Sequence, residues 1–136
     1  MPIFRLAETY LNAAEAAFQL GQIAVATDLI NVLRTRAAFR AGLSAGVLST
    51  RQAAMQITSG QVNLDFILDE RARELCGEML RWVDLAMRGD AVFVNRVKLN
   101  ADSQNVLPKH RLRPIPQQQL DAISDPDKAK YQNPGY

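Results

Sequence analysis

Apolar residues recur every three or four positions near the start of the chain, which predicts amphipathic helices. The first predicted helix runs from about Leu6 to Leu20 and is rich in alanine, a strong helix former. Gly21 follows, a residue type that often ends helices in a left-handed conformation, and a second helix is predicted from about Ile23 to Phe39. Two helices joined by such a short turn pack as an antiparallel hairpin. The apolar positions are Tyr10, Leu11, Ala14 and Phe18 in the first helix and Ile23, Ala26, Ile30, Leu33 and Ala37 in the second.

A longer stretch with the same spacing predicts one helix from about Leu64 to Met87. Asn63 is a favourable N-cap, and Asp65 in the first turn complements the helix dipole. Gly89 ends the predicted helix. The apolar stripe comprises Leu68, Ala72, Leu75, Met79, Trp82 or Val83, and Ala86, and the charged positions are Glu70, Arg71, Arg73, Glu74, Glu78, Arg81, Asp84 and Arg88.

The remaining segments have weaker patterns. Small and polar residues from 40 to 60 predict a loop, with a short helix over about Arg51–Ile57. Residues 92–99 predict a short extended or irregular piece. Five of the six prolines lie between 108 and 136, which excludes a long regular element, although Gln117–Ile123 can form one or two helical turns. The tail, residues 131–136, is expected to pack down because its two tyrosines give it surface to bury.

These elements predict an all-α fold in one domain over residues 1–136. It comprises the helical hairpin (1–39), the long helix (64–88) and an irregular, proline-rich segment (108–136). A chain of 136 residues has room for one domain, and 48% hydrophobic with 22% charged residues is ordinary for a globular protein. No uncharged apolar stretch approaches the roughly 20 residues that span a bilayer, and the chain is too apolar for intrinsic disorder.

Charge and two scarce residue types narrow the possible functions. Sixteen basic and fourteen acidic residues leave a net charge of +2, which is small for a general nucleic-acid binder. The single cysteine, Cys76, excludes an internal disulfide or a multi-cysteine metal site, and it is predicted to be a small core residue. The single histidine, His110, excludes any site that needs two. No secretory signal pattern follows Met1, so we expect a mature domain or a piece of a longer protein.

A row of carboxylates is the main candidate for chemistry. Glu70, Glu74 and Glu78 recur four residues apart and, on one interpretation, form a metal or acid–base site. A charged face with ion pairs inside the helix is the simpler interpretation, because no histidine supports a metal site. The pairs expected from spacing are Arg71–Glu74, Glu78–Arg81 and Asp84–Arg88. We therefore predict no catalytic, cofactor-binding or metal-binding residue.

Three further features have structural interpretations. Trp82 lies on the apolar stripe and is predicted to be core. His110 lies in a basic cluster, residues 109–113, that lacks interleaved aromatic residues, so a surface or packing role is expected. Asp102, Ser103 and Asn105 have oxygen-bearing side chains of the kind that bind calcium. Their segment lacks the glycine and the terminal glutamate of a calcium-binding loop, so no calcium site is predicted.

The hairpin follows the tetratricopeptide pattern, in which large and small residues recur at fixed offsets. Tyr10 occupies the first aromatic position, Ala14 and Ala26 the small positions, and Ile30 the large position after Ala26. Ala17 stands where a tyrosine is expected, and no proline closes the unit, so this is one degenerate repeat. A single repeat cannot bury its apolar faces alone, which predicts a neighbour in this chain, in a partner or in a longer protein.

Five motifs, in order, resemble the C-terminal region of SusD/RagB proteins and cover nearly the whole chain. They lie in the two hairpin helices, in the long helix, at a proline corner and at the end of the chain. The motifs are Phe4–Ala16, Ile30–Ala37, the set Glu70–Leu75 with Gly77–Glu78 and Arg81–Leu85, Arg113–Pro116 and Gln132–Tyr136.

This resemblance implies a binding role without catalysis. SusD/RagB proteins are lipid-anchored on the outer face of the outer membrane, capture oligosaccharides or other nutrients, and form a lid on a SusC-like TonB-dependent transporter. The resemblance implies the same location and partner, no cofactor, and structural or transporter-contact roles for the glutamate–arginine faces. The family's signal peptide, anchoring cysteine and N-terminal loops are absent from this sequence, so we expect it to be the C-terminal share of such a protein.

No ligand-binding residue is transferred, because the family's ligand site draws largely on loops outside this region. Phe18, Trp82 and Tyr131 are sugar-stacking candidates on chemistry alone. Two alternatives stay open: an independent tetratricopeptide-like scaffold that binds proteins, and an RNA-associated module that uses residues 109–113. Exposed apolar faces on the hairpin, over residues 10–37, also predict self-association or a partner.

Overall fold

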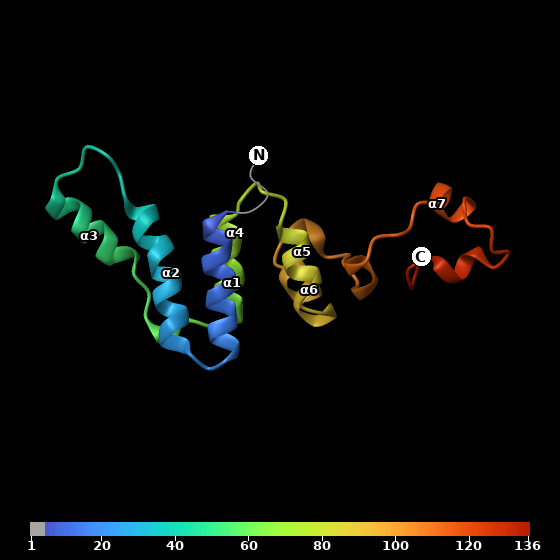
Figure 1. Cartoon of the computed structure of the whole chain (residues 1–136), viewed down its shortest axis with the longest axis horizontal. Helices are drawn as coiled ribbons and strands as arrows, with labels where there is room; N and C mark the ends of the chain where they lie inside the picture. Colours follow the sequence, from blue (N-terminus) through green and yellow to red (C-terminus); the bar gives the residue numbers. More distant parts are fainter. Residues whose placement is uncertain (1–4) are drawn as a thin grey trace. The chain divides into compact units, whose positions relative to one another are not determined.

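A computed structural model describes residues 5–136, in which every regular element is helical (Figure 1). Seven α-helices, several short 3-10 helices and no strand occur in this range, which confirms the all-α fold class. The chain divides into two compact units, the first ending at Arg81 and the second covering Trp82–Tyr136. One domain over residues 1–136 stays a prediction.

The α-helices of the first unit are α1 (Leu6–Gln19), α2 (Ile23–Ala38), α3 (Ala45–Met55) and α4 (Leu64–Glu74). A 3-10 turn, η1 (Ser59–Gln61), connects α3 to α4. The remaining α-helices are α5 (Arg81–Ala86), which begins at the boundary between the units, α6 (Asp90–Val97) and α7 (Gln117–Asp121). The 3-10 helices of the second unit are η2 (Ala101–Ser103), η3 (Pro108–Arg111) and η4 (Lys128–Tyr131).

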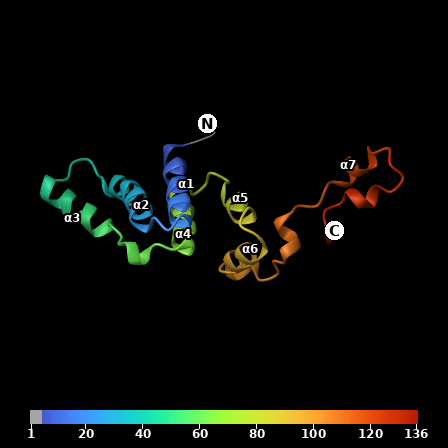
Figure 2. The same cartoon turned by 60° about the horizontal axis from the view of Figure 1, so that its bottom comes forward.

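The predicted hairpin is confirmed, and its turn has a defined geometry. Gly21 has a φ of +74°, and its N–H donates to the Phe18 carbonyl at 2.9 Å. The Gln22 N–H donates to the Ala17 carbonyl at 2.8 Å, which completes the paired bonds of a glycine-terminated helix end. After this turn α2 runs back along α1, as Figures 1 and 2 show from two directions.

The core of the first unit consists of two clusters of buried side chains. Ala14 and Ala26 are fully buried, and these small residues let α1 and α2 approach closely, as the repeat pattern predicts. On α2 the last buried position is Ala38, whereas the predicted Ala37 is exposed. The larger cluster is Ala14, Ala17, Ala26, Ile30, Ile57, Val62 and Ile67, and the smaller is Ala7, Leu11, Leu33 and Leu75.

The segment after the hairpin contains more helix than predicted. The short helix expected over Arg51–Ile57 is α3, and it begins at Ala45. Ser44 provides the N-cap, because its side-chain oxygen accepts a hydrogen bond from the Val47 N–H at 3.5 Å. None of the residues of α3 is buried, so no apolar stripe marked this helix in the sequence.

The single helix predicted over Leu64–Met87 is wrong, because the structure breaks it into α4 and α5. The N-cap is confirmed, since the Phe66 N–H donates to Asn63 Oδ1 at 2.8 Å. Helix α4 ends at Glu74, and Gly77 and Met79 then adopt φ values of +81° and +62°. Residues in the left-handed conformation cannot continue a right-handed helix, so the helix ends here. The apolar spacing of the sequence nevertheless continues past this point.

The second unit also differs from the prediction. Residues 92–99, expected to be extended or irregular, belong largely to α6, which follows Gly89. Phe93 is fully buried there, and Leu85, Val106 and Leu120 are largely buried elsewhere in the unit. The helical turns predicted after Pro116 are confirmed as α7. Among residues 5–136, no helix is long and apolar enough to cross a membrane.

Candidate functional site

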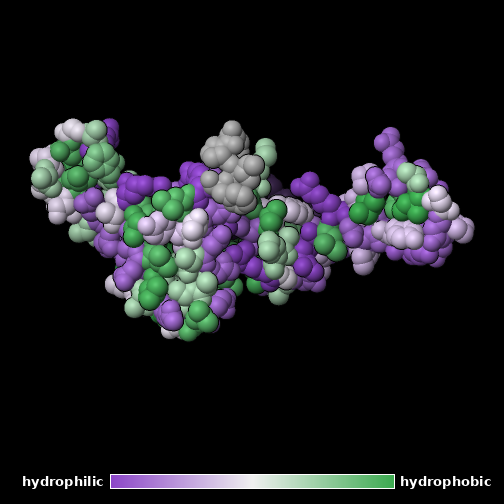
Figure 3. Space-filling model, in the orientation of Figure 1, coloured by the Kyte–Doolittle hydropathy of each residue, from purple (hydrophilic) through white to green (hydrophobic). Residues whose placement is uncertain are grey.

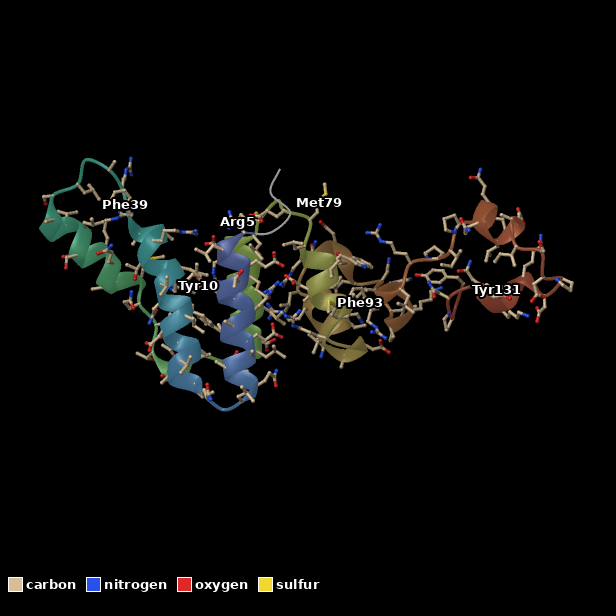
Figure 4. The ribbon with its side chains drawn as sticks, viewed as in Figure 1. Arg5, Tyr10, Phe39, Met79, Phe93 and Tyr131 are labelled. Carbon is tan, nitrogen blue, oxygen red and sulfur yellow. The ribbon has the colours of Figure 1, made fainter. Side chains whose placement is uncertain are left out.

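The carboxylate row, with Glu70 and Glu74 on α4 and Glu78 after its end, pairs chiefly with arginines from other segments. Glu70 Oε2 lies 2.7 Å from Arg34 NH1 on α2, and Glu78 Oε1 lies 3.1 Å from Arg5 NH1. Glu74 is shared: its Oε1 accepts from Arg5 NH2 at 2.6 Å and also pairs with Arg36. Arg73 adds a contact within the helix, to Glu70, at 2.7 Å. Figure 4 labels Arg5 at the start of α1, beside this network.

Some of these charged residues are buried, whereas the sequence pattern predicted a charged face exposed to solvent. Glu70 is 6% exposed and Arg71 is 3% exposed, although both were placed on a charged outer face. Arg71 NH1 donates to Asn12 Oδ1 on α1 at 2.7 Å. Asp84, on α5 of the second unit, is also buried. The glutamates therefore act as structural ion pairs, because a buried carboxylate is tolerated only when it is paired and hydrogen-bonded.

The motif in α2 holds the segment that follows α3. The Asn31 side chain pairs with the backbone of Ile57 in both directions, donating to its carbonyl at 3.0 Å and accepting from its N–H at 2.9 Å. Arg34 Nε donates to the Met55 carbonyl at 2.6 Å. One turn of α2 thus satisfies backbone groups that have no helical partner. Sequence analysis missed this role; its signal is an asparagine directly after the buried Ile30 of the apolar stripe.

The tail and the proline corner of the second unit form another set of polar contacts. Gln132 accepts from the Ile115 N–H at 2.7 Å and donates to the Ile115 carbonyl at 3.0 Å. Asn133 Nδ2 donates to the Arg113 carbonyl at 2.6 Å, and the Tyr136 hydroxyl donates to the Leu112 carbonyl at 3.0 Å. The tail packs against the corner, as predicted, but it does not bury its tyrosines, since Tyr131 is 47% and Tyr136 is 44% exposed. It packs there mainly by satisfying the backbone of the corner, where proline leaves no regular pairing.

Trp82 is not the core residue that its spacing predicted. Its side chain is 36% exposed and meets the buried Phe93 ring edge-on, with centroids 5.0 Å apart and an interplanar angle of 76°. The Arg113 guanidinium lies 5.2 Å from the Trp82 ring centroid, a cation–π contact. Trp82 therefore links α5, α6 and the proline corner within the second unit.

The two other aromatic candidates have different surroundings. Phe18 is half-buried and packs against the larger core cluster of the first unit. Tyr131 is 47% exposed, donates its hydroxyl hydrogen to Asp125 Oδ2 at 3.1 Å, and has the Lys130 ammonium 5.2 Å from its ring centroid. Figure 4 labels Tyr131 beside α7. The structure thus places the three sugar-stacking candidates in three separate environments.

Two sulfur-containing side chains contradict the predictions made for them, a core position for Cys76 and a place on the buried apolar stripe for Met79. Cys76 is exposed, and Met79 is 92% exposed, because the break between α4 and α5 turns both outward. Figure 4 shows the Met79 sulfur directed away from the ribbon.

His110 has a packing role, as expected. Its Nδ1 accepts from the Leu107 N–H at 3.1 Å, and its ring faces Tyr136 with centroids 6.4 Å apart. The adjacent Lys109 ammonium donates to the Gly135 carbonyl at 2.8 Å, and Arg111 Nε lies 2.7 Å from Asp90 Oδ1. Much of the basic cluster is thus engaged within the second unit.

The polar residues that lack a calcium-loop pattern lie around η2. The Asp102 N–H donates to Asn100 Oδ1 at 3.1 Å, which caps this turn. Within residues 5–136, no group of three or more histidine, cysteine or acidic side chains is arranged to hold a metal ion.

In the first unit, the motif residues form ion pairs between helices. In the second unit, the motif residues form hydrogen bonds between the tail and the proline corner. Within each unit, these residues thus hold its segments together. The sequence matches the SusD family over residues 1–136, so the chain belongs to the SusD family. This confirms the resemblance seen in the sequence.

Two relatives of the chain are SusD-like proteins of Formosa agariphila. One is 33% identical over 121 residues, which are 87% of this chain and 21% of that protein. A second is 36% identical over 92 residues, 68% of this chain and 18% of that protein. The chain thus spans about a fifth of the length of these relatives. No solved structure matches.

Proposed function

We propose that this chain is part of a non-catalytic nutrient-binding protein that works with a TonB-dependent outer-membrane transporter. The observation that carries the proposal is the match to the SusD family over residues 1–136. Glycans or oligosaccharides are the expected nutrients, bound by the longer protein. That protein is proposed to be a surface-exposed lipoprotein of the outer membrane.

The roles of the motif residues support a scaffold rather than a catalyst. Glu70 and Glu74, the candidates for acid–base chemistry, are engaged by Arg34, Arg36 and Arg5. A general acid or base must reach a substrate proton, and a carboxylate held by guanidinium groups is poorly placed to do so. The hairpin instead offers an outer face with exposed apolar residues, including Val25 and Val32, each 47% exposed.

The test uses the full-length protein that contains this chain, tagged and purified from solubilised outer membranes. We expect a TonB-dependent transporter to co-purify, and we expect calorimetry to detect binding of oligosaccharides. Val25→Glu should reduce the recovered transporter, because it places a charge on the outer face of α2. Val47→Glu is the matched control, since Val47 on α3 is similarly exposed, at 49%.

The outcomes separate this proposal from the alternatives. Recovery of other proteins without a transporter, together with a coding sequence that lacks an export signal, would favour the independent scaffold. Binding to mixed RNA that weakens steeply with salt would favour the RNA-associated module. Either result would contradict the proposed function.

A further inference from the structure

A hollow of about 290 Å³ lies in the second unit between α7, η4 and the end of the chain. It is lined by Gln117, Leu120, Lys128, Ala129, Gln132 and Tyr136. Ligand sites have volumes of roughly 300 Å³ and upward, so this hollow suits one small ring rather than an extended chain. Figure 3 shows a few apolar residues among mostly hydrophilic ones in this part of the chain.

Two of the lining side chains are fixed before any ligand arrives. The Gln132 amide is held by its two hydrogen bonds to Ile115, at 2.7 and 3.0 Å. The Tyr136 hydroxyl donates to the Leu112 carbonyl at 3.0 Å, and the Lys109 ammonium, which does not line the hollow, lies 4.8 Å from the centroid of the Tyr136 ring. Walls that are already ordered lose little conformational freedom on binding, which favours the capture of a small ligand.

The other lining groups combine apolar surface with hydrogen-bonding capacity. Leu120 and Ala129 contribute aliphatic surface beside the Tyr136 ring. Gln117 donates from Nε2 to Asp121 Oδ1 at 2.9 Å and retains its carbonyl oxygen as an acceptor. The Lys128 ammonium donates to the Asp121 carbonyl at 3.0 Å and has further N–H groups to offer.

We infer that this hollow binds a single pyranose residue. A pyranose has an apolar C–H face, which suits the Tyr136 ring, and hydroxyls around its edge, which suit the Gln117 carbonyl and the Lys128 ammonium. The inference rests on the proposed function and deepens it, because it places a sugar subsite within residues 117–136.

The test measures saturation-transfer NMR on the 136-residue chain with the methyl glycosides of glucose, galactose and mannose. Ala129→Trp fills the hollow with an indole, and Ala129 is exposed, so the fold should tolerate the change. We expect this variant to weaken binding about tenfold, because the indole occupies the space that the sugar ring would fill. Ala122→Trp is the matched control, because Ala122 is exposed at the end of α7 and does not line the hollow.

A second pair of variants separates binding from folding. Tyr136→Phe removes the hydroxyl and keeps the ring, so it should retain most of the binding, whereas Tyr136→Ala should lose it. Tyr131→Ala should retain binding, because Tyr131 lies outside the hollow.

Equal binding by the chain and by Ala129→Trp would overturn the inference, as would an absence of saturation transfer with every methyl glycoside. Neither result would decide whether the longer protein binds oligosaccharides, because calorimetry on that protein tests this separately. If that calorimetry fails while the chain binds a methyl glycoside through this hollow, the proposed function falls and the subsite stands.

Discussion

Glu70 shows how a single side chain can connect segments that are distant in sequence. It lies on α4 and accepts hydrogen bonds from Arg34 on α2 and from its neighbour Arg73. Its side chain is only 8% exposed, so the pair with Arg34 is shielded from solvent. Glu78, by contrast, is 24% exposed and pairs with Arg5, which is 37% exposed. The two glutamates should therefore differ in their effect on stability.

Glu70→Ala is expected to lower the free energy of unfolding by about 3 kcal/mol, because it leaves a partly buried guanidinium without its carboxylate. Glu78→Ala should lower it by less than about 1 kcal/mol, since exposed ion pairs contribute little. Urea denaturation of both variants measures the difference. Equal losses would show that burial of Glu70 does not strengthen its role.

Asp125 is a residue whose titration the structure perturbs. The Lys130 ammonium holds the pKa of this carboxyl below its usual range, with help from the Asp127 N–H and the Tyr131 hydroxyl. Because the pKa of Asp125 is lowered in the folded protein, ionisation of this carboxyl stabilises the folded turn. This contribution is fully present above the ordinary pKa of an aspartate and is lost as the pH falls through the lower folded value.

Lys130→Ala should raise the pKa of Asp125 toward its usual value, because it removes the largest cause of the shift. NMR titration of the Asp125 carboxyl measures the change. Lys128→Ala is the control, because Lys128 donates to the Asp121 carbonyl instead. A pKa unmoved by Lys130→Ala would contradict the assigned cause.

At the scale of elements, two glycines illustrate why helix ends were easier to predict than helix continuity. Gly21 was predicted to end α1, and its φ of +74° agrees. Gly77, with a φ of +81°, lies within a stretch whose apolar spacing indicated one helix from Leu64 to Met87. Periodicity reports which positions face a core, and it persists across a break when the flanking helices both contribute to cores.

Gly21→Ala is expected to destabilise the first unit by about 1 kcal/mol, because alanine is strained at a positive φ. Gly46→Ala should instead stabilise it by roughly 0.5–1 kcal/mol, because Gly46 lies inside α3 and a Cβ there meets nothing within 4 Å. Thermal melts followed by circular dichroism compare the two. A gain from Gly21→Ala would contradict the role assigned to this turn.

At the scale of the whole molecule, each unit has its own buried side chains, yet large apolar side chains stay at the surface. On the hairpin these include Leu20, 74% exposed, and Val32, 47% exposed. Figure 3 shows apolar residues over the α1–α2 hairpin in that view. Contiguous exposed apolar surface usually marks an interaction site.

We expect the chain to self-associate as its concentration rises, so that light scattering reports a mass above 15.1 kDa. Val32→Lys should reduce this association, because a charged side chain resists burial. Val47→Lys on α3 is the control. A monomer at all concentrations would contradict the expectation.

The sequence by itself determined the all-α class, the hairpin and its turn, the N-cap at Asn63 and the family to which the chain belongs. These features depend on local spacing and on residue types in fixed order, which a sequence displays directly.

The tertiary structure alone decided which charged residues are buried, where the long helix breaks, and which side chains satisfy loop backbone. Glu70 and Asn31 illustrate the reason: their partners lie 36 and 26 residues away, so helical spacing carries no information about them. The exposure of Trp82 follows likewise from how the proline corner and α6 meet it. Burial is a property of the packed chain, and periodicity predicts it only where one regular element continues.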